Sequence, residues 1–383
     1  MLRLKGLPIM SNVIMMVVNH DVVIYNFRKE LVEALIKQGN QVIILSPEGP
    51  RLKKLETLGA KIIHTPMNRH GKNPIMDYFL YRHYLKVMRQ EKPNVVLTYT
   101  IKPNLYAGLA AKKLTIPYLV NVTGLGNALT KRSVTSSLLR VLMKRSFHYA
   151  HTVFAQNKRD ESFLIDHQMV KSQISRLPGS GVNLEAFKPL PYPKEGPLKA
   201  VFISRIMKEK GIEEYLALAT HVKKSYPEAE FHVCGFVDGP YEEIIKAAHD
   251  SGLIVYHGLL DNVRTILKDV HLVIHPSYYA EGISNVLLEA AASARPIITT
   301  FNPGCEETVI DNESGLLVPI NDLQKLVQSY EKFLKLDYKQ KIRMGEIGRN
   351  YVENHFDRQH VVKAYLHNIK LTLEGNSTYE SSD

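Results

Sequence analysis

The apolar positions of the first half of the chain fall into short runs separated by longer amphipathic segments. The short runs have the length of strands and end at polar or turn residues, whereas the longer segments repeat their apolar residues with the period of a helix. The expected strands are 13–18, 41–45, 61–64, 94–98, 118–121 and 152–155, and the expected helices are 27–38, 51–58, 77–90, 105–114 and 134–149. Short strands that alternate with helices predict a parallel, doubly wound sheet.

The second half of the chain repeats this alternation. Its expected strands start at Lys199 and continue with 231–233, 254–256, 272–274 and 296–299, and 351–373 is expected to be a helix. The proline-rich stretch 188–197 between the halves is typical of a linker. Because 383 residues are too many for one ordinary core, we expect an α/β chain of two domains, 1–187 and 198–360.

A loop with two glutamates follows the expected strand 272–274. Glu281 starts a turn, Glu289 lies in the apolar helix behind it, and the turn begins with Gly282, Ile283 and Ser284. Such a loop aims backbone N–H groups and the positive helix end at a ligand above the strand, which suits a phosphate. Glu281 would then accept hydrogen bonds from sugar hydroxyls, and Glu289 could reach a ribose diol. Alternatively, Glu281 is a solvated residue before a core helix, and Glu289 lies on the wet face of that helix.

Two cations follow the first expected strand of the second half. Arg205 ends this β-rich run, and Lys210 precedes Gly211, which opens a helix. Cations at the carboxyl end of a strand can hold a diphosphate, Arg205 through its planar fork and Lys210 as a point charge. A basic loop of this kind is often only a surface feature. Its combination with the glutamate loop further along the chain makes it a specific signal.

The two loops together resemble the Glu-x7-Glu motif and the Arg/Lys loop of retaining GT-B glycosyltransferases of family 4. The resemblance extends over nearly the whole chain and is strongest over 199–319. It implies two Rossmann-like domains that face a cleft, with a terminal helix, about 361–373, that returns to the first domain. It also implies transfer of a sugar from a nucleotide diphosphate donor with retention of the anomeric configuration.

The resemblance assigns the site residues as well. Glu281, Arg205 and Lys210 would be catalytic, and the two cations with the helix N-terminus would take the charge role of a metal, so no metal or other cofactor is expected. The residues that would bind the donor are Gly235, His257, Leu260, Val263, Gly282, Ile283, Ser284 and Glu289.

The first half is expected to bind the acceptor. Its first strand is not followed by a Gly-x-Gly-x-x-Gly pattern, which argues against a dinucleotide cofactor. The Asn-Phe-Arg sequence ending at Arg28 and the Thr-Gly-Leu-Gly loop 123–126 resemble the enzymes that extend undecaprenyl-diphosphate sugars. The residues expected to contact the acceptor are Arg28, Lys102, Thr123 and Gly124. Arg28 could equally be a surface arginine.

The charge of the chain is divided unequally between its halves. The net charge is +11, made of +17 over 1–190 and −6 over 191–383. A basic half implies a polyanionic partner, and since no nucleic-acid-binding signature occurs, an anionic membrane surface fits better. The expected helix 134–149, preceded by Lys131 and Arg132, carries apolar residues flanked by cations, as a helix lying on a bilayer would. A core-facing helix with solvated cations explains this segment nearly as well, and a solvated basic surface explains the charge.

The cysteines and the apolar runs indicate the compartment. Cys234 and Cys305 are the only cysteines and lack the spacing of a metal site, which suggests a reducing compartment and, for Cys234, a buried free thiol. The run 13–18 is too short for a signal peptide, and no apolar run has the length of a membrane span. We expect a cytoplasmic protein, peripheral on the inner face of the cell membrane.

The resulting hypothesis is a retaining glycosyltransferase. It would move a hexose or N-acetylhexosamine from a UDP-sugar to an undecaprenyl-diphosphate-linked saccharide in the biosynthesis of a surface polysaccharide or glycan. The choice of uridine rests on the resemblance alone. The alternatives are a GT-B nucleotide-sugar epimerase that needs no acceptor, a glycosyltransferase with a non-lipid acceptor, and a polyanion-binding protein without catalysis.

Overall fold

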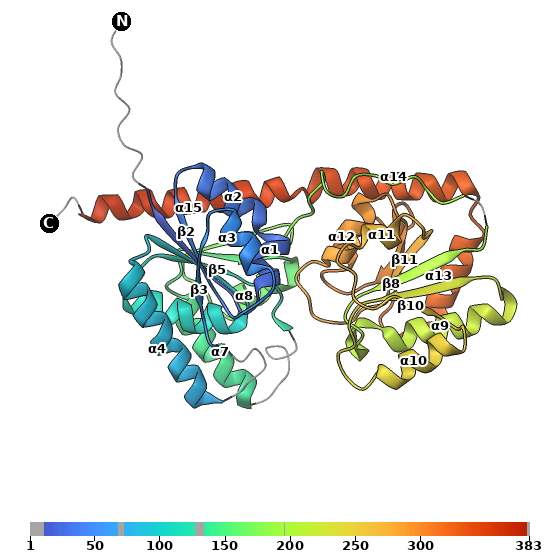
Figure 1. Cartoon of the computed structure of the whole chain (residues 1–383), viewed down its shortest axis with the longest axis horizontal. Coiled ribbons are helices and arrows are strands. Elements are labelled where there is room, and N and C mark those ends of the chain that lie inside the picture. Colours follow the sequence, from blue (N-terminus) through green and yellow to red (C-terminus); the bar gives the residue numbers. More distant parts are fainter. Residues whose placement is uncertain (1–10, 68–72, 127–133, 195, 381–383) are drawn as a thin grey trace, which may run out of the picture. The chain divides into compact units, whose positions relative to one another are not determined.

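The computed structural model describes residues 11–67, 73–126, 134–194 and 196–380 and divides into two compact units (Figure 1). Unit 1 comprises the chain up to Ser180 together with the residues from Gln359, and unit 2 comprises Gly181–Arg358. The boundaries expected at 187 and 198 both lie within unit 2. Lys131 and Arg132 lie outside the described residues.

Unit 1 is built on a seven-stranded sheet in its described part, and every strand pair in it is parallel. The strand order is β3-β2-β1-β4-β5-β6-β7. The strands are β1 (Val13–Val17), β2 (Gln41–Ser46), β3 (Lys61–His64), β4 (Val95–Tyr99), β5 (Tyr118–Asn121), β6 (Thr152–Ala155) and β7 (Gln173–Arg176). The helices are α1 (Asp21–Phe27), α2 (Lys29–Lys37), α3 (Leu52–Thr57), α4 (Pro74–Glu91), the π-helix η1 (Pro103–Ala107), α5 (Gly108–Lys113), α7 (Val134–Phe147), α8 (Lys158–Asp166) and α15 (Arg358–Glu380).

The sheet of unit 1 has an apolar core on each face, because successive side chains of a strand point to opposite sides. Met15 and Val17 of β1 belong to the core under α4, α5 and α7, whereas Ile14 and Met16 belong to the core under α2 and α3. The C-terminal helix α15 joins the second of these cores through Val361, Tyr365 and Ile369. Figure 1 shows α15 and α1–α3 on one side of the sheet and α4 and α7 on the other.

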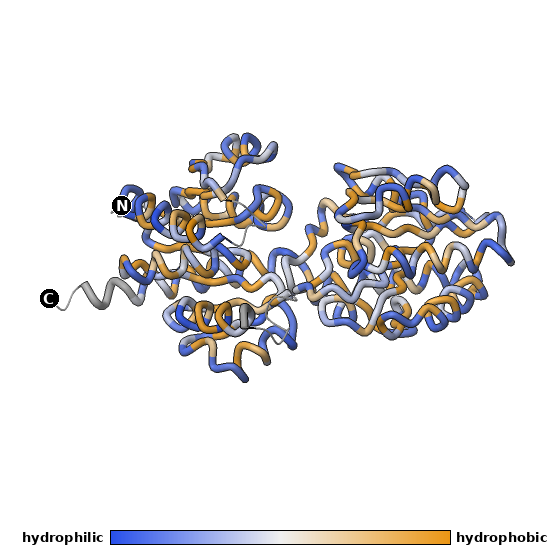
Figure 2. The backbone as a smooth tube through the Cα atoms, turned by 90° about the horizontal axis from the view of Figure 1, so that it is seen from below, coloured by the Kyte–Doolittle hydropathy of each residue, from blue (hydrophilic) through white to orange (hydrophobic). Residues whose placement is uncertain are grey.

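Unit 2 repeats this architecture with a six-stranded parallel sheet of order β10-β9-β8-β11-β12-β13. The strands are β8 (Lys199–Ile203), β9 (Glu230–Cys234), β10 (Val255–Tyr256), β11 (Leu272–His275), β12 (Ile297–Thr300) and β13 (Gly315–Val318). The helices are the 3-10 turns η2 (Lys208–Lys210) and η3 (Glu306–Thr308), and α9 (Ile212–Ser225), α10 (Glu242–Asp250), α11 (Arg264–Leu267), α12 (Asn285–Ala292), α13 (Leu323–Leu334) and α14 (Tyr338–His355). In both units the central strands are largely hydrophobic, and the helices contain both hydrophobic and hydrophilic residues (Figure 2).

The predicted class, two doubly wound parallel α/β sheets, is therefore confirmed. Each sheet reverses its winding once, between β1 and β4 in unit 1 and between β8 and β11 in unit 2. Ligands of such sheets bind beyond the carboxyl ends of the strands at this reversal. The loops after these four strands are therefore the places where functional residues are expected.

Two local predictions were wrong. The segment before Arg28 was expected only to connect strand 13–18 with helix 27–38, but it forms the helix α1. The N–H of Val22 donates to Nδ1 of the N-cap residue His20. The expected helix 351–373 is broken into α14 and α15, because the chain between them pairs with Val182 instead of continuing a helix. The N–H of Val182 donates to the carbonyl of Phe356 over 2.8 Å, and Arg358 N–H donates to Val182 over 3.0 Å.

Candidate active site

The loop after β8 and the loop after β11 approach each other closely in unit 2. Gly211, which ends η2 and precedes α9, has φ +83°, and a Cβ atom there would lie 2.3 Å from the carbonyl oxygen of Pro276. Only glycine fits both the positive φ and this contact. The predicted Arg/Lys loop and the predicted glutamate loop are thereby brought together.

Lys210 and Glu281 form an ion pair between these loops. The Nζ of Lys210 lies 2.7 Å from Oε1 of Glu281, and Lys210 is only 6% exposed. Burial by itself raises the pKa of the Glu281 carboxyl, but the Lys210 ammonium and the hydrogen bond with His275 outweigh it and hold that pKa well below its usual range. Glu281 is therefore a fixed carboxylate, and Lys210 has further N–H donors to offer a ligand.

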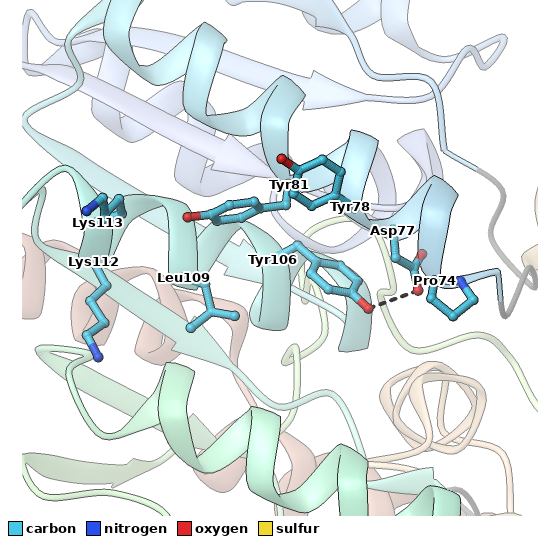
Figure 3. A pocket seen from close by; sticks show the side chains of 8 residues that line it. All are labelled: Pro74, Asp77, Tyr78, Tyr81, Tyr106, Leu109, Lys112 and Lys113. Carbon is cyan, nitrogen blue, oxygen red and sulfur yellow. Dashed lines mark hydrogen bonds between the residues drawn. The ribbon is translucent and has the colours of Figure 1, made fainter.

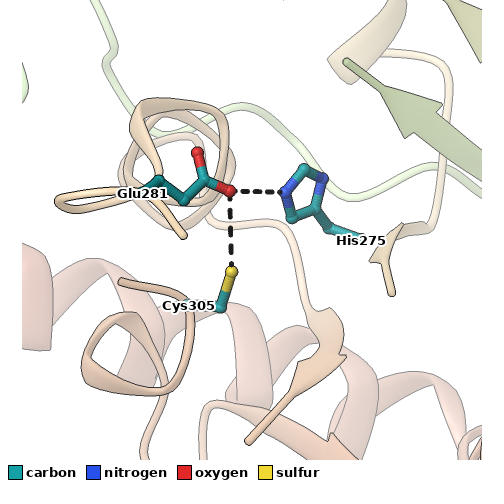
Figure 4. Close-up of side chains that lie close together, drawn as sticks. All are labelled: His275, Glu281 and Cys305. Carbon is teal, nitrogen blue, oxygen red and sulfur yellow. Dashed lines mark hydrogen bonds and ion pairs between the residues drawn. The ribbon is translucent and has the colours of Figure 1, made fainter. Parts of the chain in front are cut away.

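Three weaker donors surround the same oxygen of Glu281, and Figure 4 shows two of them, His275 and Cys305. His275 Nε2 and Ser277 Oγ each lie 3.4 Å from Oε1, and Cys305 Sγ lies 3.8 Å from it. Burial lowers the pKa of His275, so its imidazole is neutral and Nε2 carries the proton that faces the carboxylate. None of these three residues was predicted to act in the site, since nothing in the local sequence shows that they meet Glu281.

His275, Glu281 and Cys305 also have the chemistry of metal ligands, and their ligand atoms lie within 4.8 Å of one another. However, the Lys210 ammonium already contacts the carboxylate oxygen that would face a cation. Burial also raises the pKa of the Cys305 thiol far above its usual range, which disfavours the thiolate that a metal requires. The cluster therefore fits a hydrogen-bonded support for Glu281 better than a metal site.

Arg205 is partly exposed, whereas Lys210 is buried. Its guanidinium donates to Oδ2 of Asp238 over 2.9 Å and lies 5.3 Å from the ring centre of Tyr279. The Nζ of Lys210 lies 4.9 Å from the centre of the same ring. Tyr279 thus contacts both predicted diphosphate-binding cations. Sequence reasoning missed Tyr279 and Asp238, although the aromatic pair before Glu281 was a visible signal.

The N-terminus of α12 is open to an anion. Ser284 is its N-cap residue and makes no side-chain hydrogen bond to the first turn, so the N–H groups of that turn lack a side-chain cap. The Ser284 N–H itself donates to the carbonyl of Gly304 over 2.7 Å. Gly304 has φ +90°, and a Cβ there would lie 2.5 Å from the Gly282 carbonyl oxygen. The loop after β12 thereby holds Gly282, Ile283 and Ser284 in place, and all three are buried.

Glu289 lies one turn further along α12 and is partly exposed. Burial raises the pKa of its carboxyl to about 7, and the charge of Arg358 offsets only part of that rise. In the described part of the chain no hydrogen bond reaches this carboxyl group. A carboxyl group without a protein partner, near the start of a helix that can bind an anion, is available for hydroxyl groups of the same ligand.

The remaining predicted donor residues follow β9 and β10, beside β8. Gly235 has φ +144°, and a Cβ there would lie 1.7 Å from the Ser204 carbonyl oxygen, so this glycine lets the ends of β8 and β9 pack together. His257 Nε2 lies 2.9 Å from Nδ1 of His232, which was not predicted. Leu260 and Val263 pack at the margin of the apolar core.

The structure buries Arg28, the predicted acceptor residue after β1 in unit 1. It is 2% exposed, and its guanidinium lies 5.4 Å from the ring centre of Tyr99 and 5.5 Å from that of Tyr365 in α15. The alternative that Arg28 is a surface arginine is therefore wrong. Its Nε has no hydrogen-bond partner among the described residues.

The other predicted acceptor residues follow β4 and β5. Lys102 is held in an ion pair, with its Nζ 2.6 Å from Oδ1 of Asp77. Thr123 and Gly124 follow β5 after Val122, both are partly exposed, and Gly124 has φ +111°. Thr100, immediately after β4, has φ +71°, which is rare for a β-branched residue, and the π-helix η1 starts soon after it.

Buried polar atoms without partners gather at this edge of unit 1. Besides Arg28 Nε, they include Tyr99 Oη, Thr100 Oγ1 and Asn104 Oδ1, considering the described residues only. Strained backbone and unpaired buried polar groups are features of ligand sites. Apart from Arg28, sequence reasoning missed these residues, because their burial depends on α15 and on η1.

A cationic loop and an open helix N-terminus at the winding reversal of unit 2 suit a diphosphate. Two doubly wound parallel units in one chain are the architecture of the GT-B glycosyltransferases. Comparison with protein families agrees. The family Glycosyltransferase Family 4 matches residues 27–185, and the family Glycosyl transferases group 1 matches residues 186–351. The two family models together cover residues 27–351 and identify the chain as a glycosyltransferase.

Similar proteins act in glycan biosynthesis. The chain is 25% identical to the N,N'-diacetylbacillosaminyl-diphospho-undecaprenol alpha-1,3-N-acetylgalactosaminyltransferase of Campylobacter jejuni, over 90% of this chain and 94% of that one. It is 24% identical to the capsular polysaccharide biosynthesis glycosyltransferase CapM of Staphylococcus aureus, over 86% and 89%. The crystal structure of Anabaena HepE in complex with UDP-glucose superposes with a TM-score of 0.72 at 12% identity, over 96% and 99%. The protein is thus a glycosyltransferase of polysaccharide or glycan biosynthesis.

The helices of the described residues were also compared with the requirements of a membrane span. None of them combines the length and the apolar composition that crossing a bilayer requires.

Proposed function

We propose that this protein is a retaining glycosyltransferase that moves a hexose or N-acetylhexosamine from a UDP-sugar to an undecaprenyl-diphosphate-linked saccharide. The observation that carries the proposal is the buried Lys210–Glu281 pair beside the uncapped N-terminus of α12. The lipid-diphosphate acceptor is supported by the Campylobacter jejuni relative, an N-acetylgalactosaminyltransferase that acts on a diphospho-undecaprenol, which this chain matches over nearly its full length.

The donor diphosphate is bound by three kinds of group. Arg205 offers a planar fork, Lys210 offers the ammonium protons that Glu281 does not take, and α12 offers backbone N–H groups. These positive groups stabilise the charge that grows on the departing UDP, which is the role that a metal ion plays in other transferases. No metal or other cofactor is part of the proposal.

The two glutamates bind the sugars of the donor. Glu281 is ionised and fixed, so it accepts hydrogen bonds from hydroxyls of the transferred sugar. Glu289 has no protein partner among the described residues and accepts from the ribose diol. The acceptor hydroxyl attacks from the face that the diphosphate leaves, and the departing phosphate takes its proton. This course retains the anomeric configuration without a separate base.

The acceptor is bound by unit 1 and reaches it from an anionic membrane surface. Unit 1 contains the unpaired polar edge at Arg28, Tyr99, Thr100 and Asn104. Exposed apolar side chains also occur on α4 and α7, among them Phe79, Leu138 and Val141. Exposed apolar residues on a strongly basic half favour contact with anionic lipid.

The test is UDP release from a panel of UDP-sugars, with and without an undecaprenyl-diphosphate-linked saccharide. We expect release that depends on the acceptor and is fast with one sugar. NMR of the product should show that the anomeric configuration is retained. Conversion of the UDP-sugar without acceptor would indicate the epimerase instead. Absence of UDP binding would refute the donor site itself.

A further inference from the structure

A pocket of about 570 Å³ lies in unit 1 between α4 and the segment formed by η1 and α5. Its walls are mainly three tyrosines and a leucine, with two lysines at one end: Tyr78, Tyr81, Tyr106, Leu109, Lys112 and Lys113. Figure 3 shows the lysines at one end, the tyrosines between, and Asp77 with Pro74 at the other end. The volume is in the range of sites for small organic molecules.

The polar groups at the Asp77 end are already used within the protein. Oδ1 of Asp77 lies 2.6 Å from Lys102 Nζ, and Oδ2 accepts a hydrogen bond of 2.9 Å from the hydroxyl of Tyr106. A saccharide in the pocket would therefore find few free hydrogen-bonding groups there. Apart from the two lysines and the hydroxyls of Tyr78 and Tyr81, what remains available are ring faces and the Leu109 side chain, which suit an apolar ligand.

The surface around the pocket is also apolar. On the first turns of α4, Ile75 is 66% exposed, Met76 55% and Phe79 60%. Exposed apolar residues grouped in this way mark a surface for a membrane or another apolar partner. An apolar ligand in the pocket could thus continue onto α4 without crossing water.

The charge of the surrounding helices indicates which kind of apolar ligand the pocket would bind. The basic residues of α4, α5 and α7 are Arg82, Lys86, Arg89, Lys112, Lys113, Arg140, Lys144 and Arg145. The acids on these helices are Asp77 and Glu91, and each is paired with a lysine. Among the described residues no carboxylate lies within ion-pair distance of Lys112 or Lys113. The pocket thus offers an apolar groove with a cationic end, as an apolar chain attached to phosphate requires.

We propose that this pocket binds part of the isoprenoid chain of the lipid-diphosphate acceptor. The inference rests on the proposed function, which supplies such an acceptor. It adds a site for the lipid, separate from the residues that bind its saccharide. Because burial of apolar carbons favours binding, one buried isoprene unit should change acceptor affinity at least about tenfold.

The experiment compares two acceptors that carry the same saccharide diphosphate, one on undecaprenol and one on a short chain of two isoprene units. The wild type should have the lower KM for the longer chain. Leu109→Trp fills the pocket and should abolish most of this preference, at least about tenfold, without changing the KM of the UDP-sugar. Ile244→Trp, at an exposed position on α10 in unit 2, is the matched control and should keep the preference.

A second variant keeps the test valid if Leu109→Trp does not fold. Tyr78 is exposed, so Tyr78→Asp should fold, yet it places a carboxylate in the apolar wall and should also reduce the preference. Sedimentation with anionic vesicles should be the same for all variants, because the pocket holds one chain rather than the bilayer.

The outcomes separate the two proposals. An unchanged chain-length preference in the folded variants would overturn the pocket and leave the transferase activity standing. Loss of vesicle binding in parallel with the preference would also overturn it, since the effect would then lie in contact with the bilayer. Absence of transfer to either acceptor by the wild type would instead refute the proposed function.

Discussion

The ion pair between Lys210 and Glu281 allows a prediction on both stability and activity. Lys210→Met keeps the apolar stem of the side chain but removes the ammonium that lies 2.7 Å from Glu281 Oε1. Both residues are largely buried, so the variant leaves a buried carboxylate that has lost its ammonium partner. Removing one partner of a buried pair costs about 3–5 kcal/mol, and we expect a loss of this size in urea unfolding at pH 7.

The dependence on pH follows from the pKa of Glu281. In the wild type this pKa is held below its ordinary value of 4.5, so the pair adds stability above pH 4.5 that disappears as the pH falls through the lowered pKa. In Lys210→Met, burial is unopposed and the pKa rises. The variant should therefore be destabilised most at neutral pH, and the difference from the wild type should shrink towards pH 4.

Two further variants complete this test. The double variant Lys210→Met with Glu281→Gln removes both charges and should recover most of the stability. It should not recover activity, because the diphosphate has lost its cation, and kcat should be about 100-fold or more below that of the wild type. Lys208→Met, at an exposed lysine whose Nζ lies 3.6 Å from Glu213, should change neither quantity appreciably. The reasoning would be refuted by a Lys210→Met enzyme as stable as the wild type, or by one with kcat within tenfold.

Three other substitutions test the rest of the donor site. Gly211→Ala should destabilise unit 2 by more than the roughly 1–3 kcal/mol of positive-φ strain, because the added Cβ would meet Pro276. Gly252 has a similar φ of +73° but open space around it, so Gly252→Ala should show the strain alone. Equal losses of stability in urea unfolding would contradict this. Arg205→Lys should lower kcat about tenfold or more through loss of the planar fork, and an unchanged kcat would exclude a bidentate role. Glu289 is ionised above its pKa of about 7, so the KM of the UDP-sugar should rise below that pH. In Glu289→Gln this KM should no longer depend on pH. A wild-type KM that is constant from pH 6 to 8 would argue against contact between Glu289 and the ribose diol.

The strands and the main site residues could be predicted because their signals are local. Strands buried on both faces are continuous apolar runs, and the winding reversal places the loops of Arg205 and Glu281 side by side. The support of Glu281 could not be predicted in this way. Cys305 reaches Glu281 only because Gly304 allows the loop after β12 to pack under Gly282, a contact between distant parts of the chain.

Unit 1 was harder to predict for the same reason. The sequence around Arg28 gives no sign that its guanidinium lies against both Tyr99 and Tyr365, since Tyr365 comes from the other end of the chain. The helix α1 was missed because its N-cap is His20, which is not among the usual capping residues. The break between α14 and α15 depends on the pairing of the chain with Val182.

The helix α15 has a consequence for how the protein is made. A ribosome completes almost the whole of unit 1 and all of unit 2 before it synthesises Tyr365, whose hydroxyl accepts a hydrogen bond from the Asn121 side chain and whose ring covers Arg28. Domains generally fold as units during synthesis, yet here unit 1 can complete its fold only after α15 has been translated. Chains released early, with a stop codon before α15, would carry a finished unit 2 and a unit 1 in which Arg28 is uncovered. Only translation through α15 therefore yields both halves of the enzyme in folded form.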